Sequence, residues 1–226
     1  MTLDEARNSY SRFVLAMNSQ FEPTYFQHNI IAPIIDGIIA GDPRLKRVLI
    51  NLPFRHSKTT LGTINMVPFF LGHHPEQNVI ALSYGKKLAR SFGRKIRDIM
   101  QSPVYLELFP QARIAKSSRA ADEFATISGG NFWAAGFDSA LNGIGANLLI
   151  IDDPYKHRSE ATSEVIQQQR YETYNNVVRT RCEPNATIIM NTTRWTPADL
   201  VGWRISEDGA TDFFTGEPYE DERKAA

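Results

Sequence analysis

Three short stretches of the sequence carry side chains suited to binding phosphate or a metal ion, and each stretch directly follows an apolar run. In chain order they are Lys58 with Thr59, Asp152 with Asp153, and Thr192 and Thr193 with Arg194. If the apolar runs are parallel strands, the three stretches meet beyond the carboxyl ends of one sheet. Together a cation, two carboxylates and several hydroxyls favour a site for a phosphorylated ligand and its metal.

The first stretch, VLINLPFRHSKTTLGT (48–63), has the order apolar strand, short turn, Lys-Thr and helix. This is the order of a phosphate-binding loop, in which a helix N-terminus, a cation and a hydroxyl face the ligand. Lys58 would contact the β- and γ-phosphates, and Thr59 would bind magnesium. The usual pattern has glycine at the positions of Leu52 and Ser57. We expect Ser57 to hinder the backbone's approach to phosphate without blocking it if its conformation is α-like. A plain strand-loop-helix turn with a solvated lysine fits the same letters.

The second stretch, NLLIIDDPYKH (147–157), ends a buried run with two acids before Pro154. Asp152 would hold a magnesium ion through its water shell, and Asp153 would orient the attacking water. Adjacent carboxylates repel each other at the end of a buried strand unless a cation is near. The alternative is a solvent-exposed Asp-Asp-Pro turn.

The elements that would position these residues alternate between strands and helices. Apolar runs predict strands at 48–52, 78–83, 147–151 and 187–191, and FATIS-GGN-FWAA predicts a hairpin over 124–135. Helices are predicted at 3–17, 26–40 with a kink at Pro33, 59–71 with a bend at Pro68, 85–101 and 163–180. A last helix would begin with Thr196 as its cap and Pro197 in its first turn. The pattern indicates an α/β fold with a mostly parallel central sheet and helices on both faces.

Composition excludes several classes of protein. The 226 residues carry zero formal net charge, so nucleic acid would have to bind at a local basic patch. The single cysteine, Cys182, excludes an internal disulfide and a multi-cysteine metal site, and it fits a reducing compartment. No apolar run approaches the roughly 20 residues that span a bilayer. The acidic, polar start MTLDEARNSYSRF does not resemble a secretory signal.

Residues 26 to 205 resemble the ATPase domain of the large subunit of tailed-phage terminase, the DNA-packaging motor. Three motifs carry the likeness: LPFRHSKT as a variant Walker A motif, LNGIGANLLIIDDP as the Walker B region, and IIMNTTRW with a following DL as the coupling motif. The segments VIALSYGKKLARSFGRKIRDIM and SPVYLELFP are similar as well. The family commonly has Pro-Pro-Arg-His-Gly-Lys in the first motif. Pro53, Arg55, His56 and Lys58 therefore match, and Phe54 and Ser57 depart. The resemblance implies a RecA-like ASCE P-loop NTPase fold.

It also implies ATP hydrolysis with Mg²⁺ that drives double-stranded DNA into a procapsid in the host cytoplasm. The implied partners are DNA, the portal protein, the small terminase subunit and further copies in a ring on the portal, with no membrane. The implied nucleotide contacts are Pro53, Arg55, His56, Ser57, Lys58, Thr59 and Thr60. Asp153, Arg55 and Arg194 would act in catalysis, Thr59 and Asp152 would hold the metal, and Thr192 and Thr193 would couple hydrolysis to movement. Gln27 would read adenine, although a plain helix-surface residue fits as well; His56 would touch nucleotide or buttress the loop.

Two departures from the family alter these expectations. The family often has an arginine between the glycines that are Gly143 and Gly145 here, where this chain has Ile144. An arginine finger would then come from Arg55, Arg158 or Arg194, or be lacking. The expected organisation is a helical segment at 1–40 packing on the core, an ATPase core at 41–205 and a linker at 206–226. That linker would lead towards an absent nuclease domain, so nuclease activity is not expected from this chain.

The segment 84–97 is strongly basic. Lys86, Arg90, Arg94 and Arg97 recur at helical spacing and would bind DNA phosphates or a neighbouring subunit. A solvated outer helix face explains the same pattern. Two other functions remain open: a nucleotide-binding assembly module with weak intrinsic hydrolysis, and a helicase-like DNA-dependent ATPase.

Overall fold

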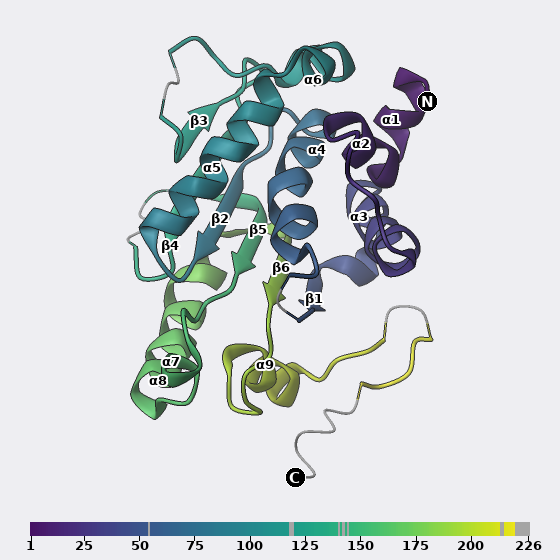
Figure 1. The fold of residues 1–226 in the computed structure, drawn as a ribbon. Helices are drawn as coiled ribbons and strands as arrows, with labels where there is room; N and C mark the ends of the chain where they lie inside the picture. Colours follow the sequence, from purple (N-terminus) through teal and green to yellow (C-terminus); the bar gives the residue numbers. More distant parts are fainter. Residues whose placement is uncertain are drawn as a thin grey trace.

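The computed structural model describes residues 1–53, 55–117, 120–139, 141, 143, 145–212 and 215–219. They build one six-stranded sheet, in the order β1-β6-β5-β2-β4-β3 (Figure 1). The strands are β1 (Arg47–Asn51), β2 (Val79–Ser83), β3 (Glu123–Ala125), β4 (Asn131–Gly136), β5 (Ala146–Asp152) and β6 (Cys182–Thr192). All neighbours pair in parallel except β3, which is antiparallel to β4. The predicted mostly parallel α/β sheet and the hairpin are confirmed.

Helices connect the strands and cover both faces of the sheet. They are α1 (Leu3–Asn8), α2 (Tyr10–Met17), α3 (Ala32–Ile39), α4 (Met66–His73), α5 (Lys86–Gln101), α6 (Pro103–Leu108), α7 (Arg158–Ala161), α8 (Glu164–Thr173) and α9 (Leu200–Asp208). Wider π-type turns occur at Gln27–Ile31, Thr60–Asn65 and Tyr174–Val178, and short 3-10 turns at Pro43–Leu45, Pro110–Ala112 and Arg179–Arg181. None of the helices in the described ranges is both long and apolar enough to cross a membrane.

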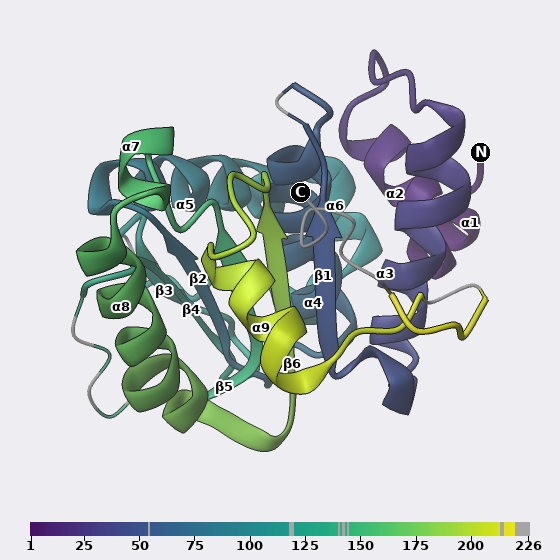
Figure 2. The same cartoon turned by 90° about the horizontal axis from the view of Figure 1, so that it is seen from below.

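Alternate residues of each central strand enter two separate cores, one on each face of the sheet. On β2, Val79 and Ala81 pack with the side chains of α2 to α6, whereas Ile80 and Leu82 pack with those of α8 and α9. Figure 2 shows the same division, with α8 and α9 in front of the strands and α4 and α5 behind them. Burial on both faces explains why the central strands are almost continuously apolar in sequence.

The N-terminal helices extend the first core beyond β1. Phe13 of α2 lies with its ring centroid 5.1 Å from that of Phe69 on α4. Tyr10 donates from its hydroxyl to the carbonyl of Leu61, in the segment that follows the Lys58 loop. Residues before 40 therefore pack directly against the helix that carries the candidate phosphate loop.

Two predicted helix boundaries are wrong. The helix expected over 3–17 breaks at Ser9, which is extended (φ −142°, ψ 123°), because Asp36 of α3 accepts the Tyr10 N–H at 2.7 Å. The helix expected to begin at Thr196 begins instead at Leu200 with Asp199 as its cap. The Asp199 carboxylate accepts the Gly202 N–H at 2.9 Å and the Thr196 N–H at 3.2 Å. A carboxylate at this position is a stronger acceptor than the Thr196 hydroxyl.

Candidate functional site

The three stretches singled out from the sequence meet at one edge of the sheet. β1, β5 and β6 are parallel, and their register pairs Asn51 with Thr192 and Asp152 with Asn191. β6 lies between the other two, and residues at its tip contact both the Lys58 loop and the acidic pair. The edge therefore gathers a lysine, two aspartates and several hydroxyls within hydrogen-bonding reach.

The loop after β1 contains two residues in the left-handed region of backbone space. Arg55 has φ 64° and Ser57 has φ 60°, values that glycine adopts without strain. Ser57 thus has a left-handed φ, which a glycine at this position would adopt more easily. Its carbonyl accepts the Leu61 N–H at 2.9 Å, so a helix begins here and places Lys58 and Thr59 in its first turn. First-turn N–H groups have no intrahelical acceptor and suit an anion.

Lys58 is buried and links the loop to the other two strand tips. Its ammonium lies 2.9 Å from Asp153 Oδ2 and donates to the Thr193 hydroxyl at 2.6 Å. Asp153, which has φ 47°, also accepts the Thr193 N–H at 3.0 Å. Lys58, Asp153 and Thr193 therefore form one connected polar group, and the solvated-lysine interpretation is wrong.

Asp152 is almost completely buried, with 1% of its surface exposed. Thr59 donates to its Oδ1 at 2.9 Å, and Thr63 and Asn191 donate to its Oδ2, the latter at 3.0 Å. The pKa of Asp152 is raised from 3.8 to about 6, mainly by burial and also by the neighbouring Asp153 charge. The solvent-exposed Asp-Asp-Pro turn does not describe this geometry.

The residues at this edge fit a magnesium ion in the chemistry of their donors. Thr59 Oγ1 and Asp152 Oδ1 face each other at 2.9 Å, and both are hard oxygen donors. Magnesium typically takes one or two protein oxygens and completes its shell with water and substrate phosphates. A buried carboxylate with a raised pKa is also a group whose charge a cation would stabilise.

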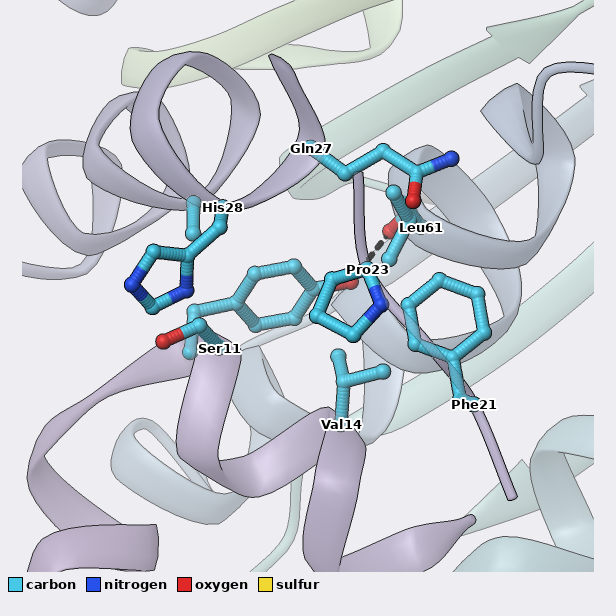
Figure 3. Close-up of a pocket in the computed structure, with 9 residues that line it drawn as sticks. Ser11, Val14, Phe21, Pro23, Gln27, His28 and Leu61 are labelled. Carbon is cyan, nitrogen blue, oxygen red and sulfur yellow. Dashed lines mark hydrogen bonds between the residues drawn. The ribbon is translucent and has the colours of Figure 1, made fainter. Parts of the chain in front are cut away.

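Gln27 lies against the loop and is not a helix-surface residue. Its side chain is 9% exposed, and its amide donates to the His56 carbonyl at 3.4 Å while accepting the Thr24 N–H at 3.0 Å. Figure 3 shows Gln27 at the rim of a small pocket lined also by Phe21, Pro23 and Leu61. Gln27 therefore holds the loop backbone; whether it also contacts a base stays a prediction.

The other predicted loop residues are placed as follows. Pro53, Arg55 and His56 are exposed, and Thr60 begins the π-type turn Thr60–Asn65. Gln27 donates to the His56 backbone carbonyl, and the role of the His56 side chain stays a prediction. Phe54 lies outside the described residues.

The candidate arginines differ in their surroundings. Arg194 forms a buried ion pair with Asp199 at 3.0 Å, with 4% of each side chain exposed, and also donates to the Thr196 carbonyl at 3.2 Å. Arg55 and Arg158 are exposed. Ile144 lies outside the described residues. Arg194 is thus bound within its own loop, whereas the other two are accessible to a ligand or neighbour; a finger role for any of them stays a prediction.

The cations of α5 are on the outer side of that helix. Lys86, Arg90 and Arg94 are exposed and Arg97 is half-buried, while Phe92 and Ile96 face the core. Arg90 lies 3.9 Å from Asp122, at the outer limit of an ion pair. The predicted stripe is therefore present on the surface, and its ligand is untested.

Sequence reasoning missed two residues of the site. Thr63 donates to Asp152, and Asn191 contacts both Asp152 and the Lys58 carbonyl. Thr63 follows Thr59 by one helical turn, so helical spacing was a usable signal. Asn191 is the last residue of the predicted strand TIIMN, and its position beside Asp152 can be inferred only once the strand register is known.

No model of a protein family matches the chain, and no curated protein matches it. Among solved structures, the crystal structure of the HK97 bacteriophage large terminase is similar, with a TM-score of 0.53 and 13% sequence identity. The match covers 83% of this chain and 36% of that chain, so the chain spans just over a third of the terminase's length. Likeness at this identity concerns the fold, and at that level it confirms the resemblance noted in the sequence. The chain thus has the RecA-like α/β fold of a bacteriophage large terminase over most of its length.

Proposed function

We propose that the chain is an ATPase that hydrolyses Mg²⁺-ATP to move double-stranded viral DNA into a procapsid. The observation that carries this proposal is the convergence of Lys58, Asp152 and Asp153 beside Thr193 at one sheet edge. The terminase fold, found independently of these residues, supports the same function.

The proposed roles of the residues combine their contacts with the resemblance noted in the sequence. Lys58 binds the β- and γ-phosphates, since it lies in the first turn of a helix whose N–H groups suit an anion. Thr59 and Asp152 hold magnesium, which when bound neutralises phosphate charge. Asp153 orients the attacking water. Thr193, which is hydrogen-bonded to both Lys58 and Asp153, detects loss of the γ-phosphate. Gln27 contacts the adenine and Arg55 the phosphates.

The partners and location are part of the same proposal. Duplex DNA, the portal protein and the small terminase subunit are the partners, and copies of the chain act as a ring on the portal during assembly in the host cytoplasm. The exposed cations of α5 supply one surface suited to DNA phosphates. The finger arginine comes from a neighbouring copy, with exposed Arg55 and Arg158 as the accessible candidates in the described ranges.

The test is isothermal titration of the chain with ATP in the presence and absence of Mg²⁺, followed by steady-state phosphate release. We expect magnesium-dependent binding, its loss in Lys58→Ala, and turnover per chain that rises with protein concentration if a neighbour donates the finger. Absence of magnesium-dependent ATP binding by the wild-type chain would overturn the proposal.

A specific observation favours one alternative, an assembly module that binds nucleotide and hydrolyses it weakly. Asp153, the proposed water-orienting group, is paired with Lys58 at 2.9 Å. If the pair persists with nucleotide bound, ATP will bind without turnover at any protein concentration. A helicase-like ATPase would instead separate the strands of a forked duplex, an activity that a packaging motor lacks.

A further inference from the structure

Asn191 joins all three strand tips through one buried amide group. The side chain is fully buried, and its Nδ2 donates to the Lys58 carbonyl at 2.8 Å and to Asp152 Oδ2 at 3.0 Å. The first contact holds the start of the loop helix, and the second holds the end of β5. Asn191 itself belongs to β6 and immediately precedes Thr192 and Thr193.

The contacts make the two oxygens of Asp152 inequivalent. Oδ2 accepts from Asn191 and from Thr63, which is itself fully buried. Oδ1 accepts from Thr59, the residue proposed to bind the metal. Two core donors therefore fix one oxygen and direct the other towards Thr59.

The local packing is specific for this arrangement. A Cβ added at Gly62 would lie 2.7 Å from Asn191 Nδ2, so glycine is needed for the amide to approach the loop helix. Asn191 Oδ1 is buried without a hydrogen-bond partner among the described residues. An unsatisfied buried acceptor destabilises a fold. A residue retained for packing alone would not carry that penalty, which indicates that the Nδ2 contacts are what the site requires.

We propose that Asn191, together with Thr63, is a positioning residue that orients Asp152 for the magnesium ion of a bound nucleotide. The inference rests on the proposed function, because it concerns the metal that accompanies the nucleotide. It assigns Asn191 and Thr63 no contact with the substrate. Outer partners of this kind orient a metal-binding side chain, and their loss typically weakens metal affinity about 10–100-fold.

The test measures the affinity of a fluorescent ATP analogue in excess EDTA and over a magnesium titration, by anisotropy. The variants are Asn191→Ala, Thr63→Val and Thr63→Ser, with Thr187→Val, earlier on the same face of β6, as the control for strand damage. Thermal melts identify any variant that does not fold. The two Thr63 variants keep the test decisive if Asn191→Ala fails to fold, because Thr63→Val replaces only the hydroxyl by a methyl, whereas Thr63→Ser keeps the hydroxyl and removes the methyl.

We expect affinity in EDTA to stay within about twofold of wild type for the Thr63 and Thr187 variants, which keep the bond from Asn191 to the Lys58 carbonyl. Asn191→Ala loses that bond as well, so its affinity should fall more with magnesium than without it. The magnesium needed for half-maximal enhancement should rise at least about tenfold in Asn191→Ala and Thr63→Val. Thr63→Ser and Thr187→Val should match wild type. Unchanged magnesium dependence in folded Asn191→Ala and Thr63→Val, or an equal loss with and without magnesium, would overturn this inference alone. No magnesium-dependent binding by wild type would instead overturn the proposed function.

Discussion

Lys58 and Asp153 form an ion pair of 2.9 Å between the loop after β1 and the end of β5, with 7% and 21% of their side chains exposed. In the proposed function both groups have other partners: a phosphate for Lys58 and a water molecule for Asp153. A bound triphosphate must therefore compete with Asp153 for the ammonium group. The ion pair therefore opposes nucleotide binding in the proposed function. Breaking it frees the Asp153 carboxylate to orient the attacking water.

Asp153→Asn should separate these two effects. The amide keeps an oxygen for the Thr193 N–H but removes the charge that competes for Lys58. Nucleotide affinity should therefore stay equal or rise a few-fold, while phosphate release falls about 10²-fold or more. Affinity is read from fluorescent-nucleotide titration and turnover from phosphate release, with Lys58→Ala as the variant that loses binding. If Asp153→Asn lost nucleotide binding as fully as Lys58→Ala, Asp153 would be needed for binding and not only for hydrolysis.

Ser57→Gly should stabilise the loop. At φ 60°, a side chain costs roughly 1 kcal/mol that glycine avoids, partly offset by glycine's greater freedom in the unfolded chain. We expect a gain of up to about 1 kcal/mol in the free energy of unfolding, and a loss of about 1–3 kcal/mol in Ser57→Val, whose branched side chain is strained there. Urea unfolding measures both. Destabilisation by glycine would mean that the serine hydroxyl holds the loop.

The raised pKa of Asp152 predicts a pH-dependent stability in the metal-free chain. Because the folded-state pKa of about 6 exceeds 3.8, folding favours the protonated form. The raised pKa contributes roughly 3 kcal/mol to the free energy of unfolding below about pH 4, and this contribution is lost as pH rises through 6. Asp152→Asn lacks it, so urea unfolding from pH 4.5 to 8 should show the wild type weakening relative to this variant. A constant difference across that range would contradict the assignment.

Magnesium binding should show the opposite dependence on pH. Protonation of Asp152 removes the charge that attracts the cation, so magnesium-dependent nucleotide affinity should fall as pH drops below about 6. Affinity in EDTA, which rests on Lys58, should change less over the same range. Isothermal titration at pH 5 and pH 7.5, with and without Mg²⁺, tests this.

The Arg194–Asp199 pair should behave as a buried ion pair. With 4% of each side chain exposed, Arg194→Met leaves an unpaired carboxylate and should cost about 3–5 kcal/mol of unfolding free energy. The double variant with Asp199→Asn should cost less than the sum of the singles, because the orphaned charge is removed. Arg44→Met, which breaks an exposed pair, is the matched control and should change stability far less. A small effect of Arg194→Met would leave Arg194 available for a partner's phosphate.

The cations of α5 should contribute to duplex binding without reading sequence. Replacing Lys86, Arg90 and Arg94 with alanine should reduce the slope of log affinity against log salt concentration by about one for each DNA phosphate that is no longer neutralised. Arg12→Ala, at an exposed arginine on α2, controls for a general change in charge. Fluorescence anisotropy with a labelled duplex over a salt series provides the slope. Equal slopes in the triple variant and the control would place the DNA elsewhere.

The sequence predicted what depends on local pattern. Runs such as VIALS and LLII are buried on both faces, so their apolar letters indicate strands whatever the surroundings. The basic stripe of α5 was equally readable, because helical spacing alone sets which cations face outward.

Interactions and backbone conformations that the local pattern does not reveal decided the rest. The break at Ser9 depends on Asp36, and the start of α9 on a carboxylate that also pairs with Arg194. The left-handed Ser57 could not be predicted from a residue type that rarely adopts this conformation. Asn191 reads as an ordinary strand end until β6 is placed between β1 and β5.

The central position of β6 has a consequence for the newly made chain. Among the described strands, β1 pairs with β6, which is the last strand to leave the ribosome. Until residues 182–192 emerge, β1 has no neighbour in the sheet and the Lys58 loop lacks the strand tip that it contacts. A chain cut short before that point exposes the bare edges of β1 and β5 and lacks the middle of its site. The candidate site thus assembles only when translation of this sheet is nearly finished.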